Sequence, residues 1–152
     1  MLFSARPVTA FLLVMATASC QPAPAPTPPD DGGDTRTPVA LPAEARTKIL
    51  AEMRTMLGSV HDILVALPAG DTAGVRVAAE RSGVAAAVDP ELVKLVPSQF
   101  VQMGMAAHQG FDDVRSAVTA GAGTDSIVAM LSRSTASCVA CHATFRLVVK
   151  QP

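Results

Sequence analysis

The chain has 152 residues and a formal net charge of −1 at pH 7, and 49% of its residues are hydrophobic. That length suffices for one domain, and the near-cancelling charges with no basic run argue against nucleic-acid binding, which needs a positively charged surface. The sequence has no Trp or Tyr, and beyond the first 20 residues its aromatic side chains are Phe100, Phe111 and Phe145. A large apolar ligand would help to fill a core that has so few aromatic residues, although Met and Leu side chains can also fill it.

Residues 1–19 are predicted to be a signal peptide. Arg6 is the only charged residue among them, and the apolar run that follows is too short to span a bilayer. Two cleavage sites are consistent with the sequence: residues 16–18 form an A-x-A site, whereas "TASC" at 17–20 resembles the bacterial lipobox, with Thr17 where Leu is usual. In the second case Cys20 is lipidated. We favour this second interpretation, which predicts a lipoprotein in the bacterial periplasm that is anchored to a membrane.

Residues 20–43 are predicted to form a Pro-rich linker. The segment contains "QPAPAPTPPDDGGDTRTPVALP", which shows no helical or strand periodicity. Such a composition cannot bury enough apolar surface to offset the entropy of the chain. If Cys20 is lipidated, about twenty residues at ~3.1 Å each could hold the following domain up to ~60 Å from a membrane. The domain itself is expected to span residues 44–152.

Four helices are expected in this domain, over residues 44–67, 72–88, 98–120 and 126–149. The first has apolar residues at steps of one, three and four, which is typical of one helical face. Asp71 or Thr72 can cap the second helix, which is rich in Ala and interrupted by glycine. No segment alternates with period two over the length that a sheet requires. Four helices with short connections predict an all-α fold, an antiparallel four-helix bundle.

Two of these helices carry the residues that matter for function. The apolar face of the first is expected to comprise Ile49, Met53, Met56, Leu57, Val60, Leu64 and Leu67. One face of the fourth is expected to comprise Ile127, Leu131, Cys138, His142, Phe145 and Val149.

The fourth helix contains the stretch "ASCVACHATFR" at residues 136–146. At about 100° per residue, Cys138, Cys141 and His142 project from one sector of a helix, which we expect to face the bundle interior. Covalent c-type haem needs this order, because two thiols attack the two vinyl groups and the adjacent imidazole binds the iron.

Two other interpretations of the stretch remain. Zinc usually takes four ligands from two separated pairs, and here only His61 and His108 could be added. A redox dithiol would belong near a βαβ pattern, whereas a structural disulfide would need no cofactor and would make the chain a structural lipoprotein. We favour haem because the motif follows an export signal and lies in a predicted helical bundle.

The stretch "CVACHATFR" at the end of a four-helix pattern resembles the class II c-type cytochromes, the cytochrome c prime group. That family carries the haem motif in its last helix, followed by an aromatic residue and an Arg, which Phe145 and Arg146 match. The resemblance covers about residues 44–150 and is strongest over 135–150; the second helix matches poorly. It implies one covalent haem c per chain, with Cys138 and Cys141 as thioether anchors and His142 as the proximal iron ligand. It also implies Arg146 along the proximal haem face, although a helix-end Arg that complements the dipole is the alternative.

The resemblance further places the first helix over the distal face of the haem. Low-spin members supply a Met thioether there as sixth ligand, whereas high-spin members leave the position open. Counting back from "ALPAGD" puts the ligand position near Met53, with Met56 as its rival and core packing as the alternative for both. His61 is expected at the surface, and His108 is expected to be a hydrogen-bonded neighbour of the site, not a ligand.

The expected function is single-electron transfer between redox protein partners in the periplasm or at a membrane, with no enzymatic reaction. If the sixth position is open, the alternative is a five-coordinate haem protein that binds nitric oxide or carbon monoxide as a sensor or scavenger. Members of the family often dimerise, so the resemblance also implies a homodimer.

Overall fold

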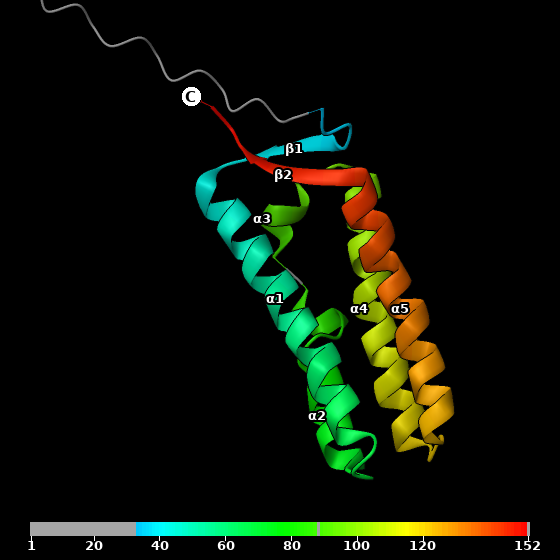
Figure 1. Ribbon diagram of the computed structural model, residues 1–152. Helices are drawn as coiled ribbons and strands as arrows, with labels where there is room; N and C mark the ends of the chain where they lie inside the picture. Colours follow the sequence, from blue (N-terminus) through cyan, green and yellow to red (C-terminus); the bar gives the residue numbers. More distant parts are fainter. Residues whose placement is uncertain (1–32, 88, 152) are drawn as a thin grey trace, which may run out of the picture. The chain divides into compact units, whose positions relative to one another are not determined.

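The computed structural model describes residues 33–87 and 89–151, which form a mostly helical domain with a small parallel sheet (Figure 1). The main helices are α1 (Ala43–Ala66), α2 (Thr72–Glu80), α4 (Ser98–Thr119) and α5 (Thr124–Thr144). Between α2 and α4 lie the short helices η1 (Val84–Ala86) and α3 (Pro90–Val93). The strands are β1 (Thr37–Leu41) and β2 (Phe145–Val149). The predicted set of about four packed helices is therefore confirmed, and the sheet is an addition.

Local sequence explains where the helices begin and end. Asp71 caps α2 as predicted, because its carboxylate accepts a hydrogen bond from the backbone N–H of Gly74 at 2.8 Å. The predicted second helix up to residue 88 is wrong beyond Glu80, where the chain continues as turns and η1. The chain reverses after α1 at Gly70 and after α4 at Gly121, and both glycines adopt positive φ angles that L-residues disfavour.

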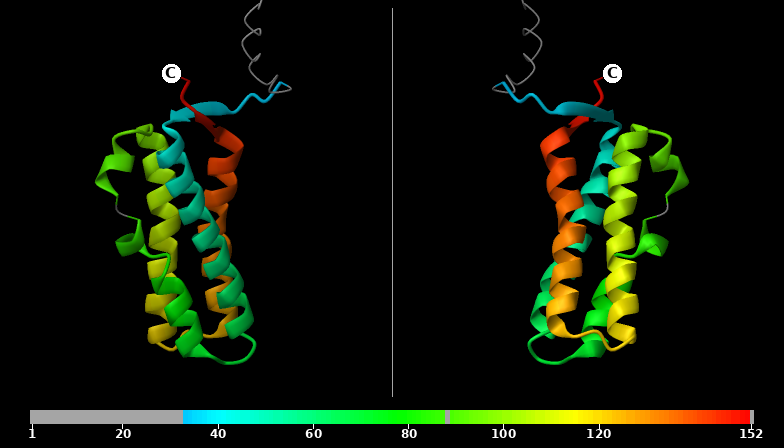
Figure 2. Two further views of the ribbon diagram at one scale, coloured as in Figure 1. Left: turned by 90° about the vertical axis from the view of Figure 1, so that its left-hand side faces the viewer. Right: turned by 90° about the vertical axis from the view of Figure 1, so that its right-hand side faces the viewer.

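The sheet joins the two ends of the described chain. β1 and β2 pair in parallel, from Thr37 opposite Phe145 to Leu41 opposite Val149. Figure 2 shows the sheet lying across the end of the domain where α1 begins and α5 ends. β1 falls inside the stretch predicted as linker, so the compact unit begins at Asp34 and not at residue 44.

Both strands are too short to be predicted from the sequence. Val39 and Leu41 are buried with an exposed residue between them, but this alternation lasts only five residues and contains Pro38. The prediction that the fourth helix reaches Val149 is also wrong, because residues from Phe145 onward form β2. That segment is rich in β-branched and aromatic side chains, which favour a strand once a partner is present.

The helices bury faces that differ in part from those predicted. In α1, Leu57 and Leu64 are exposed at 70% and 47%, whereas Ser59 and Ile63 are buried. In α5, Ser134 and Cys141 are buried and His142 is exposed. The expectation that His142 faces the interior is therefore wrong.

The close contact between α4 and α5 explains this rotation of α5. The two helices lie side by side along their length (Figure 2). Gly110 on α4 leaves room for Ser134, because a Cβ atom at Gly110 would collide with the Ser134 hydroxyl. That hydroxyl donates a hydrogen bond to the carbonyl of Ala107 at 3.2 Å. This close contact between Gly110 and Ser134, called the Gly110–Ser134 seam below, turns Ser134 and Cys141 inward.

Two clusters of buried side chains form the core. The first core lies among α1, α2, α4 and α5 and includes Ile63, Val75, Phe111, Val114 and Ile127. The second core lies beneath the sheet and includes Val39, Leu41, Ile49, Cys141 and Phe145. Phe100 packs against the second core with its ring at 67° to that of Phe145 and 5.6 Å between the centroids. This geometry is a favourable edge-to-face contact.

Candidate functional site

An apolar cleft adjoins the second core and is partly open to solvent. Its wall combines side chains of α1, α3, α4 and α5 with the segments that connect them. The apolar residues among them include Ile49, Met53, Met56, Leu92, Val96, Phe100, Met105 and Cys141. A cleft of this character can accept a large apolar group with a few polar contacts.

The structure brings one residue of the Cys-x-x-Cys-His stretch into this cleft. Cys141 is buried and contributes to the cleft wall, whereas Cys138 is half-buried and His142 is exposed in the last turn of α5. Both thiols are free. The predicted grouping on one helix is therefore present, but only Cys141 is turned fully inward.

Burial governs the acidity of the two thiols. Desolvation raises the pKa of Cys138, and desolvation together with the neighbouring Cys138 raises the pKa of Cys141. Both groups are therefore protonated at neutral pH. Catalytic dithiols instead have lowered pKa values that supply a reactive thiolate, so this environment disfavours a redox dithiol.

Met53 and Met56 contribute to the cleft wall from α1. Both side chains are half-buried, and both belong to the predicted inward face. Met53 packs against the second core and Met56 against the first. The two thioethers thus remain rivals for the predicted role of sixth ligand.

His108 and Glu52 form a polar contact at the edge of the cleft. The buried His108 ring has its Nδ1 atom 2.8 Å from the carbonyl oxygen of Ser82 and its Nε2 atom 2.9 Å from Oε1 of Glu52. Burial by itself lowers the pKa of His108, but Glu52 and the carbonyls of Ser82 and Gly83 together raise it above its ordinary value. This confirms the prediction that His108 is a hydrogen-bonded neighbour; the predicted surface position of His61 is confirmed as well.

Glu52 is a residue of the site that the sequence pattern did not predict. Glu52 directly precedes Met53 on α1. It contacts His108 only because α1 and α4 come together in the folded domain. Only its place on a largely apolar helix face could have drawn attention to it.

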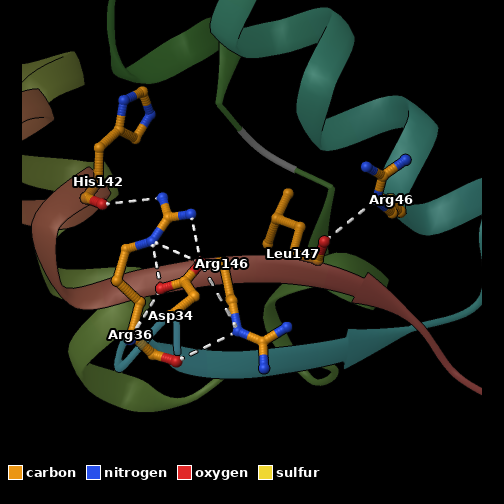
Figure 3. Close-up of polar contacts among 6 residues, drawn as sticks. All are labelled: Asp34, Arg36, Arg46, His142, Arg146 and Leu147. Atoms are coloured by element: carbon orange, nitrogen blue, oxygen red, sulfur yellow. Dashed lines mark hydrogen bonds and ion pairs between the residues drawn. The ribbon is translucent and has the colours of Figure 1, made fainter. Parts of the chain in front are cut away.

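Arg146 lies in β2, not one turn along the helix from His142 as predicted (Figure 3). Its Nε atom donates a hydrogen bond to the carbonyl of Arg36 at 3.4 Å and lies 4.0 Å from a carboxylate oxygen of Asp34. Arg36 in turn donates from Nη1 to the carbonyl of His142 at 3.2 Å. Hydrogen bonds from Arg36 lower the pKa of Asp34 to about 2. No sequence pattern indicates this cluster, because Arg36 lies more than a hundred residues from His142 and Arg146.

Two further observations concern the described residues only. In residues 33–87 and 89–151, no three His, Cys, Asp or Glu side chains gather into a group that could hold a metal ion. None of the helices in this part combines the length and the apolar character of a membrane-spanning segment. The predicted signal peptide, Cys20 and the linker up to residue 32 lie outside the described residues.

Comparisons of the chain with protein-family models, with curated proteins and with solved structures found no match. The resemblance to class II c-type cytochromes therefore rests on the sequence pattern.

Proposed function

We propose that the chain is an exported monohaem c-type cytochrome that carries single electrons between redox partners. The observation that carries the proposal is the position of Cys141. This residue belongs to the Cys-x-x-Cys-His stretch and also contributes to the wall of an apolar cleft that the methionines of α1 share. The residues of covalent haem attachment are thus connected, through Cys141, to a cleft with an apolar wall. In this proposal the helices form an antiparallel four-helix bundle around the cofactor.

The residue types and their spacing are those that a covalently bound haem needs, and Cys141 is the residue of the stretch that lines the cleft. Cys138 and Cys141 lie three residues apart on α5, and each thiol would add across one vinyl group, with the S–H hydrogen transferred to a vinyl carbon. This addition consumes no oxidant. His142 would be the proximal iron ligand, and Met53 or Met56 would supply a thioether from α1. Bound haem supplies an iron that changes its oxidation state by one electron.

The chain's own residues would tune and expose this centre. The apolar wall of the cleft would limit water around the cofactor, which affects the reduction potential. His142 is exposed, so a redox partner can approach the end of α5 that carries it.

The alternative function is the binding of nitric oxide or carbon monoxide. It is supported by the opening of the cleft to solvent, because a diatomic molecule could then reach a vacant sixth position. A methionine ligand would block that position.

The test is the mass and absorption spectrum of the protein after export in a bacterium that attaches haem c. We expect the mass of one haem per chain and a low-spin spectrum that does not respond to carbon monoxide. Cys141→Ser should lose one thioether bond, whereas Ser137→Ala, a neighbouring change, should leave the spectrum intact. A haem-containing protein that is high-spin and responds to carbon monoxide would favour the alternative, and a colourless wild-type protein would contradict both.

Anchoring to a membrane is a separate part of the proposal. Cys20→Ser is expected to move the protein from the membrane fraction to the soluble periplasmic fraction, because the lipid would be lost. The haem mass should stay unchanged in this variant, which serves as the control for correct export. Retention of Cys20→Ser in the membrane fraction would contradict the lipid anchor.

A homodimer is also part of the proposal. Leu57, Leu64 and Val65 are exposed apolar side chains on α1, and such groups favour association when they are contiguous. Light scattering of the wild-type protein should therefore give twice the mass of one chain, and a monomer at all concentrations would contradict this.

A further inference from the structure

The end of α5 depends on a residue from the far end of the chain. The last carbonyls of a helix have no partners within it and need capping groups. At the end of α5 the backbone N–H of Phe145 donates to the carbonyl of Cys141. The next carbonyl, that of His142, accepts a hydrogen bond from Nη1 of Arg36, which precedes it by 106 residues. A charged donor at a helix C-terminus also complements the helix dipole.

Arg36 is itself held in place by several contacts. Its Nε atom donates to Oδ1 of Asp34 at 3.0 Å, and its Nη2 atom donates to Oδ2 at 2.7 Å. Its carbonyl accepts from Arg146, and the residue that follows it begins the ladder between β1 and β2. Such a paired guanidinium has less freedom than an isolated side chain, so it can fix the carbonyl that it contacts.

Figure 3 shows that the contact leaves the His142 ring free. The imidazole points away from Arg36, Asp34 and Arg146, whereas the carbonyl of His142 points toward Arg36. Arg36 therefore acts on the backbone of this residue and does not occupy either ring nitrogen. β2 begins at Phe145 and also holds this helix end, so the bond from Arg36 adds to the contacts that define the Cα–Cβ direction of His142.

We propose that Arg36, held by Asp34, is a positioning residue that fixes the backbone from which the His142 imidazole would reach a bound haem iron. This inference rests on the proposed function, because it assigns a role at the same site. It makes the segment that precedes β1 a part of the redox centre, although this segment contributes no iron ligand. A residue inside the stretch predicted as linker would then help to set the geometry of the proximal ligand.

The test compares Arg36→Ala with a matched control in the full-length, haem-loaded protein. Arg46 donates from Nε to the carbonyl of Leu147 at 3.3 Å, so Arg46→Ala removes the same kind of bond to β2 without touching His142. The first readout is the NMR shifts of the haem methyl groups in the oxidised protein, which report the orientation of the axial imidazole. The second is hydrogen exchange of the backbone amides at 144–146.

We expect Arg36→Ala to displace or broaden the haem methyl resonances and to speed exchange at 144–146 about tenfold, because a hydrogen bond from a charged donor is lost. Arg46→Ala should leave the methyl resonances as in the wild type. Arg36→Lys keeps a charged donor, so its methyl resonances and its exchange rates should lie closer to those of the wild type. This variant also serves as the test if Arg36→Ala folds poorly.

Three results would count against the inference in different ways. Methyl resonances that are identical in Arg36→Ala and wild type would overturn the positioning role while the proposed cytochrome function stands. Equal changes in Arg36→Ala and Arg46→Ala would overturn it as well, because the effect would then be a general loosening of the sheet. A wild-type protein without covalent haem would overturn the proposed function itself, and the inference with it.

Discussion

The first core contains large side chains that are almost completely buried, whereas the second core borders a cleft whose methionines are only half-buried. Phe111, Ile63 and Ile127 in the first core expose at most 2% of their surface. In the second core, Met53 and Phe100 pack against the buried residues but also contribute to the cleft wall. Full packing indicates that the first core stabilises the fold, whereas the second core, under the proposed function, would accommodate the haem.

The two cores also differ in the sequence distance of their contacts. The first core joins long helices, and its members span the sequence from Ile63 to Leu131. The second core depends on β1 and β2, whose paired residues lie 108 positions apart, as in Thr37 and Phe145. The chemistry proposed for this chain thus lies where the structure is held by contacts between distant segments.

Truncation of the first core should have the largest effect on stability. Phe111→Ala removes a large ring that is 2% exposed, and such a change costs about 3–5 kcal/mol of the free energy of unfolding. Urea unfolding of the wild type and the variant measures this difference. Val77→Ala, at a position on α2 that is 59% exposed, is the control and should change the free energy by less than about 0.5 kcal/mol. Equal losses in the two variants would contradict the assigned core.

The seam between α4 and α5 should be the next most sensitive feature. Gly110→Ala places a methyl group against the Ser134 hydroxyl, and overpacking of this kind costs about 1–3 kcal/mol. Ser134→Gly combined with Gly110→Ala should recover part of the loss, because it removes the colliding atoms. Thermal unfolding of the single and double variants measures the coupling. A Gly110→Ala protein as stable as the wild type would show that the helices separate at little cost.

The sequence allowed prediction of the helices that build the first core, because their apolar residues recur with helical spacing over many turns. Asp71 as a cap and the start of α4 after Pro97 followed from residues next to each other. The sheet could not be predicted in this way, because each strand has five residues and its partner lies at the other end of the domain.

The candidate site shows the same division. The Cys-x-x-Cys-His stretch is recognisable from its spacing, and Met53 from its place on an apolar face. The exposure of His142 was missed because it follows from the Gly110–Ser134 seam, which lies on two different helices. The contact of Arg36 with the carbonyl of His142 depends on β1, so it could not be predicted from hydrophobic periodicity either.

Replacement of the cleft methionines separates stability from cofactor chemistry. Met53→Ala removes a half-buried side chain, so the loss should be about 1–2 kcal/mol, less than in the first core. In the haem-loaded protein, however, Met53→Ala should convert a low-spin spectrum to a high-spin one. Met56→Ala, which removes the other thioether on the cleft wall, is the matched control and should stay low-spin. A spectral change confined to Met56→Ala would transfer the ligand role to that residue.

The contact between His108 and Glu52 should have the smallest effect, and it should depend on pH. The raised pKa of His108 means that the protonated ring is favoured in the folded state. The resulting stabilisation is fully present below the ordinary value of 6.5 and is lost as the pH rises through the higher value of the folded protein. Because Glu52 is partly exposed, we expect less than about 1 kcal/mol from the pair.

Unfolding of the wild type and of Glu52→Gln between pH 6 and pH 9 tests this dependence. The difference in free energy of unfolding between the two proteins should shrink as the pH rises, because the neutral His108 ring no longer gains from a carboxylate at its Nε2 atom. His61→Gln, a change at an exposed histidine, should give a difference that is nearly independent of pH. A constant difference between wild type and Glu52→Gln would mean that the two side chains share no charge interaction. The pH-dependent result would instead show that α1 and α4 are joined electrostatically beside the cleft, where apolar packing is incomplete.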